Sequence, residues 1–477
     1  MHRPGGLARV LGLWDVVLFH IVAVIGLRWL LTAARIGPSS IVLWLVAVTL
    51  FFVPQGLAVL ELSARVPDEG GIYVWTKRAF GPVHGFICGW AYWVNNLIYY
   101  PTLIIFAAGN AAAALGSRYL GLADHLPFQI VFSLTILWLA VGLNIVGLKT
   151  GRWVQNAGAG STWTIVVILV LLALVGWIGG TGRNPLEGGS LVPRLDGANI
   201  NLWSSLCFAL AGLELASVLG GEVRDPARTL TRSILVAAPL IAGVYIVGTL
   251  SVLGTMPRGG VDLVTGLPEA VANVGAGMPF DLGRLTAALL VIASVGGIGA
   301  WLAGTARIPF VVGLDRYLPP ALGRVHPRWR TPHVALMVQG VGATLFIAIG
   351  ALGSTVEEAY LVLVDTTIIV YFIPYLYLFL ALPVLRRRGV GGDRLTARIP
   401  GGTGVVMLVA VAGFGTTAAS IVLAALPGES AEPWLFMTKV IGGAAGLMIV
   451  GLAFYWIATR RYRGEGGGPG HATAAAQ

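Results

Sequence analysis

The sequence predicts an all-α membrane protein with twelve transmembrane helices. Its composition, the length of its apolar runs and the placement of its charges lead to this prediction. The chain has 477 residues, of which 56% are hydrophobic and only 11% are charged, whereas a soluble domain carries about 25% charged residues. An ordinary cytosolic protein could not solvate such a surface. The two cysteines lie in apolar runs, so the chain is not a disulfide scaffold either.

Twelve runs are long and apolar enough for helices that cross a bilayer, which takes about 20 residues. The first run follows Arg3 and Arg9, as the apolar part of a signal peptide would. Eleven further runs and the lack of a clean cleavage site favour a retained first helix. In order, the runs are residues 13–33, 41–63, 83–114, 127–147, 154–178, 202–220, 233–255, 283–308, 334–352, 359–385, 404–426 and 434–458.

The basic residues indicate the orientation. Most of the 31 lysines and arginines fall in the N-terminal tail and in the loops on the same side of the membrane. The positive-inside rule therefore predicts a plasma (inner) membrane protein with both termini in the cytoplasm. Because the arginines are spread over all these loops and form no single patch, we expect no nucleic-acid partner. The Gly/Ala-rich tail from Gly464 to Gln477 is predicted to be disordered.

The motifs of common enzyme sites are missing from the sequence. No lysine follows a glycine, so there is no P-loop, and no histidine precedes a glutamate, so there is no zincin motif. No nucleophile–base pair or metal cluster stands out. We therefore expect neither an enzyme nor a bound cofactor or metal.

Charged residues inside a bilayer are costly and commonly mark a pathway. Arg28, Glu214 and Asp365 lie within predicted spans, and Glu61 lies at the inner end of the second span. Spans 1 and 6 each combine a glycine with one of these charges, and each begins a five-helix half. Paired interruptions of this kind indicate an inverted-repeat transporter, in which unwound backbone binds a polar substrate and helix N-termini favour its carboxylate. The alternative is two unbroken helices whose charged side chains pair with each other.

Four short motifs occur in order along the chain, and in order and spacing they resemble the amino acid–polyamine–organocation superfamily of transporters over nearly its whole length. The sequence of helices 1–3, which includes Gly37–Ser40 and Tyr73–Gly81, is most similar to the glutamate/γ-aminobutyrate antiporter-like branch. The four motifs are Glu61–Tyr73, Asn144–Lys149, Gly212–Glu214 with Glu222–Arg228, and Asp315–Pro319 with Thr331–His333.

The resemblance implies a LeuT-type fold. Helices 1–5 (residues 13–178) and helices 6–10 (199–385) would form inverted repeats, followed by two further helices (404–458). Residues 1–12 and 459–477 would be cytoplasmic tails. It also implies a secondary transporter that moves amino acids or related amines by alternating access. The sequence does not indicate the oligomeric state.

The resemblance also places a substrate site near mid-membrane. By position, this site would consist of the two helix breaks, an aromatic gate at Phe208, a tyrosine of helix 3, residues of helix 8 that form one wall, and an acidic residue on helix 10. These expected site residues are Ile25, Gly26, Leu27, Arg28, Tyr92, Phe208, Ala211, Gly212, Leu213, Ile298, Trp301 and Asp365.

Two positions depart from the family pattern. Arg28 replaces the second glycine of the helix 1 break. It would either clamp a substrate carboxylate bidentately or sit outward of the site, paired with an acidic residue. Ile298 stands where some relatives have a tryptophan, with Trp301 one turn later, so this wall of the site has a different shape.

Glu214 is the candidate for energy coupling. The helix 8 stretch Ser294–Gly299 has no adjacent hydroxyl pair for sodium, and Val154–Trp177 contains no ionisable residue. Exchange, or coupling to protons through Glu214, is therefore favoured. Glu214 would be either neutral and hydrogen-bonded or ionised and paired, with Arg28 the nearest partner by depth. The rival function is a receptor or scaffold that keeps the fold without transporting.

Overall fold

The structure is a computed structural model that describes residues 9–179, 191–193, 197–255, 262–275, 278–350, 356–392, 396–426 and 432–463. Within these ranges the regular structure is helical, apart from one isolated bridge between Leu11 and Val223. The predicted tail from Gly464 onward lies outside the described residues.

The elements of the first half are α1 (Leu13–Val24), α2 (Arg28–Ile36), α3 (Ser40–Ala47), the π-helix η1 (Val48–Phe52), α4 (Val53–Arg65), α5 (Ile72–Phe80), α6 (Pro82–Leu115), η2 (Ser117–Asp124), α7 (Leu126–Val146) and α8 (Leu148–Ile178). The second half has α9 (Gly197–Ala209), α10 (Leu215–Val218), η3 (Gly220–Glu222), α11 (Pro226–Thr255), α12 (Gly266–Val274), α13 (Leu282–Thr305), α14 (Arg307–Leu314), η4 (Pro320–Gly323), α15 (His333–Gly350) and α16 (Val356–Arg387). The last two helices are α17 (Gly402–Ala424) and α18 (Pro433–Arg463).

The described helices agree with the predicted spans in type and position, and for the most part in length. Nine are long and apolar enough to cross a membrane, and the bent pair of α1 and α2 makes ten. The two remaining predicted spans fall short of this length. The sixth is divided into α9 and the short α10, and the apolar part of the ninth covers only His333–Ala348.

Both helices with a central glycine are broken, so the alternative of two continuous helices is wrong. Helix 1 stops at Val24 and restarts at Arg28, with a bend of 46°. Helix 6 stops at Ala209 and restarts at Leu215. Gly212 has φ +125°, and a Cβ there would lie 3.1 Å from the Val24 side chain. The positive φ therefore strongly favours glycine at this position, and a side chain there would also crowd Val24 of the other break.

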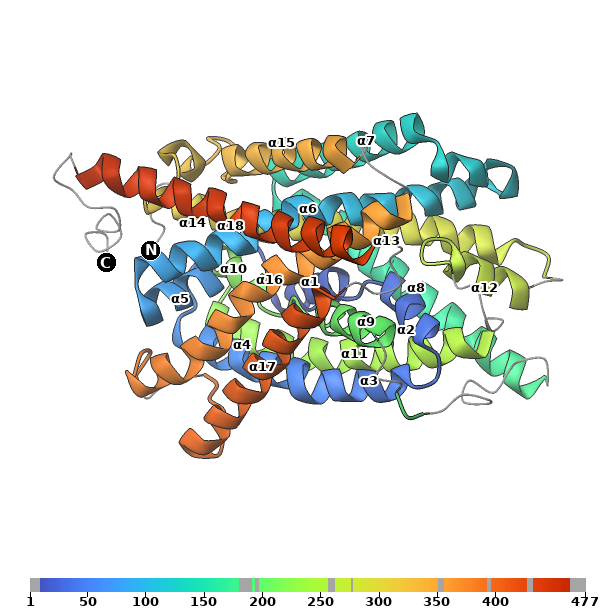
Figure 1. Cartoon of the computed structure of the whole chain (residues 1–477), viewed down its shortest axis with the longest axis horizontal. Helices are drawn as coiled ribbons and strands as arrows, with labels where there is room; N and C mark the ends of the chain where they lie inside the picture. Colours follow the sequence, from blue (N-terminus) through green and yellow to red (C-terminus); the bar gives the residue numbers. More distant parts are fainter. Residues whose placement is uncertain are drawn as a thin grey trace.

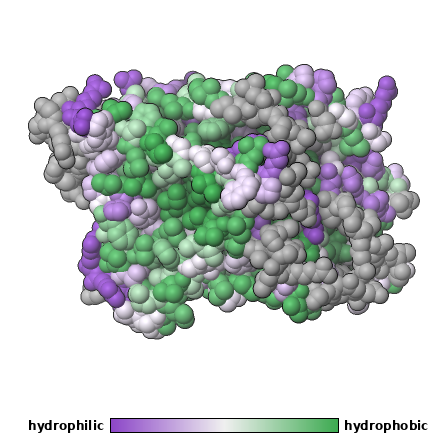
Figure 2. Space-filling model, in the orientation of Figure 1, coloured by the Kyte–Doolittle hydropathy of each residue, from purple (hydrophilic) through white to green (hydrophobic). Residues whose placement is uncertain are grey.

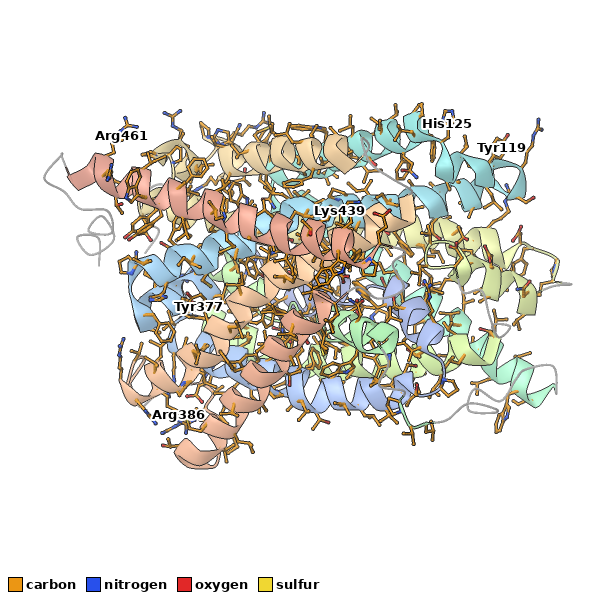
Figure 3. The ribbon with its side chains drawn as sticks, viewed as in Figure 1. Tyr119, His125, Tyr377, Arg386, Lys439 and Arg461 are labelled. Carbon is orange, nitrogen blue, oxygen red and sulfur yellow. The ribbon has the colours of Figure 1, made fainter. Side chains whose placement is uncertain are left out.

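The broken helices lie in the middle of the bundle (Figure 1), with α6 and α18 on one side and α3 and α11 on the other. Hydrophobic side chains cover much of the middle of the face in Figure 2, and hydrophilic ones gather toward its two ends. Arg386 and Arg461, both assigned to cytoplasmic segments by the sequence, lie at one end of the bundle in Figure 3, and Tyr119 and His125 lie at the other.

The end of the bundle that carries α5 and α14 is held together around the exit of helix 6. The Glu222 carboxylate forms an ion pair with Arg307 at 2.7 Å, and the backbone carbonyl of Glu222 accepts the N–H of Leu11 at 3.1 Å. One carboxylate oxygen of Glu69 accepts the N–H of Gly221 at 2.6 Å. Burial raises the pKa of Glu69, the charge of Glu222 raises it further, and Arg307 lowers it.

We predict that Glu69→Gln flattens the dependence of stability on pH. The folded protein holds the Glu69 proton more tightly than the unfolded chain does, so this group stabilises the fold below the ordinary glutamate pKa of about 4.3. That contribution is lost as the pH rises from the ordinary pKa toward the raised one, at about 1.4 kcal/mol for each pH unit between them. Thermal unfolding of purified protein in detergent between pH 4 and pH 9 measures it.

The matched control is Glu269→Gln, which changes an exposed glutamate on α12. It should leave the pH dependence of wild-type stability in place. A Glu69→Gln protein whose stability still falls with rising pH as steeply as the wild type would mean that Glu69 is not the responsible group.

Candidate functional site

One tyrosine hydroxyl on α11 serves both helix breaks. The Gly26 N–H donates to the Tyr245 hydroxyl oxygen at 3.0 Å. The same hydroxyl lies within donating distance of the Val24 carbonyl at 2.7 Å and the Ala209 carbonyl at 3.0 Å. Since a hydroxyl has a single hydrogen, it donates to one of these carbonyls at a time. Trp44 stacks on the Tyr245 ring, with 4.6 Å between the ring centroids.

Two further side chains satisfy backbone groups at the breaks. The indole N–H of Trp301 on α13 donates to the Ala23 carbonyl at 2.9 Å. The N–H of Gly212 donates to the Tyr375 hydroxyl of α16 at 2.7 Å. The unwound backbone of helices 1 and 6 is therefore held by side chains from α11, α13 and α16, as a polar backbone within an apolar bundle requires.

The Glu214 carboxylate follows the helix 6 break, is fully buried, and accepts four hydrogen bonds. Tyr92 and Tyr371 donate to Oε1 at 2.9 and 2.6 Å. Tyr375 and Gln55 donate to Oε2 at 2.5 and 3.1 Å. Because Tyr375 also accepts the Gly212 N–H, a continuous chain of hydrogen bonds connects the helix 6 break to this carboxylate.

Four aromatic rings from four helices form a closed cluster beside the breaks, which we call the aromatic cluster: Tyr99, Phe208, Tyr371 and Trp301. Successive centroids are 5.5 Å apart for Tyr99–Phe208 and Phe208–Tyr371, and 5.8 Å apart for Tyr371–Trp301 and Trp301–Tyr99. All four pairs meet edge to face, the favourable geometry for such rings. Phe208, the predicted gate, is thus part of a packed layer that joins helices α6, α9, α13 and α16.

Arg28 begins α2, and its side chain is buried at 2% exposure. The guanidinium carbon lies 4.6 Å from the Trp29 ring centroid and 5.0 Å from that of Tyr99. Its Nη1 makes a long hydrogen bond of 3.4 Å to Thr102. In the described part of the chain it has no ion pair, so the expectations that it pairs with an acidic residue, or with Glu214 in particular, are wrong.

The remaining predicted site residues occupy varied positions. Leu213 approaches Gly56 of α4, where an added Cβ would lie 3.6 Å from it. Asp365 accepts a long 3.4 Å hydrogen bond from Asn201 of α9, which also donates to the Leu426 carbonyl just after α17. Four others are buried apolar residues around the breaks: Ile25, Leu27, Ala211 and Ile298.

The expected site residues leave out several polar residues of the centre. Gln55, Tyr245, Tyr371 and Tyr375 all bind either Glu214 or the backbone at the breaks. Each is a hydrogen-bonding residue in an otherwise apolar span, which is the signal that could have singled them out. The spacing of four between Tyr371 and Tyr375 also places them on one face of α16.

The chain matches the family model described as amino acid permease over residues 11–446. The chain belongs to this amino acid permease family. Its relatives include an uncharacterized transporter of Legionella pneumophila, 29% identical over 446 residues that cover 91% of this chain and 94% of the relative.

Two further relatives carry functional names. The serine/threonine exchanger SteT of Bacillus subtilis is 27% identical, over 71% of this chain and 73% of the relative. The probable agmatine/putrescine antiporter AguD of Lactococcus lactis is 23% identical, over 74% and 75%. The permease is therefore a multi-pass membrane protein and a secondary transporter. These comparisons do not support the rival function of a non-transporting receptor.

We predict that Tyr245→Phe destabilises the permease more than the loss of a single hydrogen bond would. The change leaves the Gly26 N–H and a carbonyl at the breaks without this partner, and an orphaned buried group costs about 1–3 kcal/mol. Thermal unfolding of purified protein measures the effect.

The control is Tyr100→Phe, which removes a hydroxyl of equal burial whose partners in the described part of the chain are the side chains of Thr305 and Gln339. Equal losses of stability in the two variants would contradict the special role of Tyr245 at the helix breaks.

Proposed function

We propose that the permease moves an amino acid or a related amine by alternating access, and that the substrate binds between the helix 1 and helix 6 breaks. The observation that carries the proposal is the pair of unwound segments, 25–27 and 210–214. Side chains of α11 and α16 bind backbone groups within these segments, and Trp301 of α13 binds the last turn of α1. A substrate's polar groups can take the place of such side chains. The relatives are named for amino acids in one case and for amines in the other.

The architecture that we propose around this site has twelve spans. Residues 13–178 and 199–385 form two inverted five-helix repeats, 404–458 adds two helices, and residues 1–12 and 459–477 are cytoplasmic tails of a plasma membrane protein. The packing at the α5 end supports this arrangement. There, Leu11 before α1 pairs with Val223 after helix 6. The start of the first proposed repeat's first helix therefore lies beside the end of the second repeat's first helix, as expected if the repeats are inverted.

We assign energy coupling to exchange or to protons through Glu214. The hydrogen-bond chain from the Gly212 N–H through Tyr375 to Glu214 supports this assignment. Protonation of Glu214 turns one of its acceptor positions into a donor, so at least one of the four donors around it must reorient. If Tyr375 is that donor, its hydrogen bond with the Gly212 N–H at the break changes as well. Coupling requires that protonation favours one of two conformations. The alternative is a fixed brace for helix 6.

The contact between α8 and α13 argues against a cation bound between these helices. An added Cβ at Gly158 would lie 2.8 Å from the Cα of Gly296, and one at Gly297 would lie 3.3 Å from the Val22 carbonyl. The backbones of α8, α13 and α1 are therefore packed against each other, in the region where sodium-coupled relatives of the resembled superfamily need hydroxyl ligands.

We predict that Gly26→Leu and Gly212→Leu both abolish substrate binding. At Gly26 a Cβ would lie 2.8 Å from the Trp29 ring, and at Gly212 the positive φ disfavours any side chain. Binding to purified protein is measured with a substrate found by counterflow in liposomes. Gly442→Leu is the control, because an added Cβ there meets nothing within 4 Å. Normal binding by both site variants would place the site elsewhere.

We predict that Glu214→Gln keeps substrate binding, flattens the pH dependence of transport and slows net flux. Glutamine has nearly the same shape as glutamate but cannot titrate, so the tyrosine cage remains while the proton-dependent change is lost. Uptake into liposomes across a range of pH measures this, with the exposed Glu269→Gln as control. An unchanged pH profile, at normal expression and binding, would remove the switching role and leave that of a brace.

A further inference from the structure

Arg28 differs from the other buried arginines. Arg65 pairs with Glu61 and Arg307 pairs with Glu222, each at 2.7 Å. Arg28 is buried at 2% exposure, yet no acidic side chain of the described chain forms an ion pair with it. A buried charge without a counter-charge is unfavourable, so an anion that reaches Arg28 during the protein's work would stabilise it.

The free atoms of Arg28 form one particular edge of the guanidinium. Its Nη1 binds Thr102 at 3.4 Å, while Nε and Nη2 have no hydrogen-bond partner among the residues that the structure describes. Nε and Nη2 share one side of the planar group, and this side presents two parallel N–H donors that match the two oxygens of a carboxylate.

The rings around Arg28 hold the guanidinium without competing for these donors. Trp29 and Tyr99 lie against it, with centroids 4.6 and 5.0 Å from its central carbon, as in cation–π contacts. Such contacts use the faces of the rings and leave the N–H groups available. Both rings also touch Phe208, at 5.7 and 5.5 Å between centroids, so Arg28 sits directly against the aromatic cluster at the breaks.

Glu214, the other charged residue near the breaks, is not available to bind an amine in the same way. Its two oxygens already accept four hydrogen bonds, from three tyrosines and Gln55. The centre therefore offers a cation whose donors are free and an acid whose acceptor positions are filled. A diamine would bring a second positive charge next to Arg28, where charges of the same sign repel.

We propose that Arg28 is a specificity-determining residue that binds a carboxylate of the substrate through Nε and Nη2. The permease therefore selects amino acids or other carboxylated amines and rejects substrates whose only charges are positive. This inference rests on the proposed site between the helix breaks.

The test measures counterflow and binding with the full-length permease in liposomes. The probes are the twenty amino acids, γ-aminobutyrate, putrescine and the carboxamide of each acid that is transported. We expect transport of carboxylated probes only, and at least tenfold weaker binding of the matching carboxamide. L-Glutamate with L-glutamine, and L-alanine with L-alaninamide, separate a distal carboxylate from the α-carboxylate. Transport of putrescine, or equal affinity for acid and amide, would overturn the proposal.

Arg28→Gln should bind acid and carboxamide with similar affinity, and Arg28→Lys should keep the preference but bind at least tenfold more weakly, since lysine has no planar fork. The control Arg35→Gln removes an exposed charge from the same helix and should keep wild-type preference. Arg28→Gln should also leave the ligand-free protein at least as stable as the wild type, because it removes an uncompensated charge. If Arg28→Gln keeps the acid preference, Arg28 does not bind the carboxylate.

Two outcomes separate this inference from the proposed site. In the first outcome, Arg28→Gln loses the preference for the acid while Gly26→Leu and Gly212→Leu bind normally. This result would support the role of Arg28 and reject the substrate site at the backbone. In the second outcome, both glycine variants lose substrate binding while Arg28→Gln keeps the preference for the acid. This result would support the substrate site at the backbone and reject the role of Arg28.

Discussion

A helix that unwinds inside an apolar bundle frees N–H and C=O groups that lipid cannot satisfy. The centre of this permease is organised by that constraint. Tyr245 binds backbone groups at both breaks, Trp301 binds the end of α1, and Tyr375 binds the N–H of Gly212. Because these three side chains come from α11, α13 and α16, they connect the breaks to the helices around them, and Tyr245 connects the two breaks to each other.

The same constraint links the backbone to the charges. Tyr375 joins the helix 6 break to Glu214, and Tyr371 joins Glu214 to the aromatic cluster, with 5.5 Å between its ring centroid and that of Phe208. Arg28 lies against the same cluster through Tyr99. The rings therefore separate a satisfied acid from an unsatisfied cation and prevent their mutual neutralisation. A substrate that binds between the breaks meets both sets of contacts, which is how its arrival can influence both halves of the bundle.

The sequence predicted the class of fold and the position of the breaks because these depend on local signals. Long apolar runs fix the helices, and a glycine beside a charge at Gly26 and Gly212 marked where two of them stop. Phe208, Tyr92 and Trp301 were found through the family resemblance, and all three contact the network at the centre. These features could be predicted from the sequence because each depends on a short stretch of the chain.

The pairing of side chains was not predictable, because it depends on how distant helices are rotated against each other. Depth alone suggested that Glu214 and Arg28 pair, whereas α16 turns Tyr371 and Tyr375 toward the acid, and α6 turns Tyr99 toward the arginine. Nothing in the sequence indicated that the partner of Asp365 on helix 10 is Asn201. A polar residue in an apolar span indicates that it has a partner, but only the packed structure identifies which one.

The central claim is that substrate replaces protein side chains at the two helix breaks. An experimental structure of the permease with a substrate identified by counterflow tests it most directly. The account predicts that the substrate's polar groups contact the backbone of segments 25–27 and 210–214, with Phe208 or Trp301 displaced from the aromatic cluster. A substrate bound away from both segments, with the hydrogen bonds of Tyr245 and Tyr375 unchanged, would contradict it.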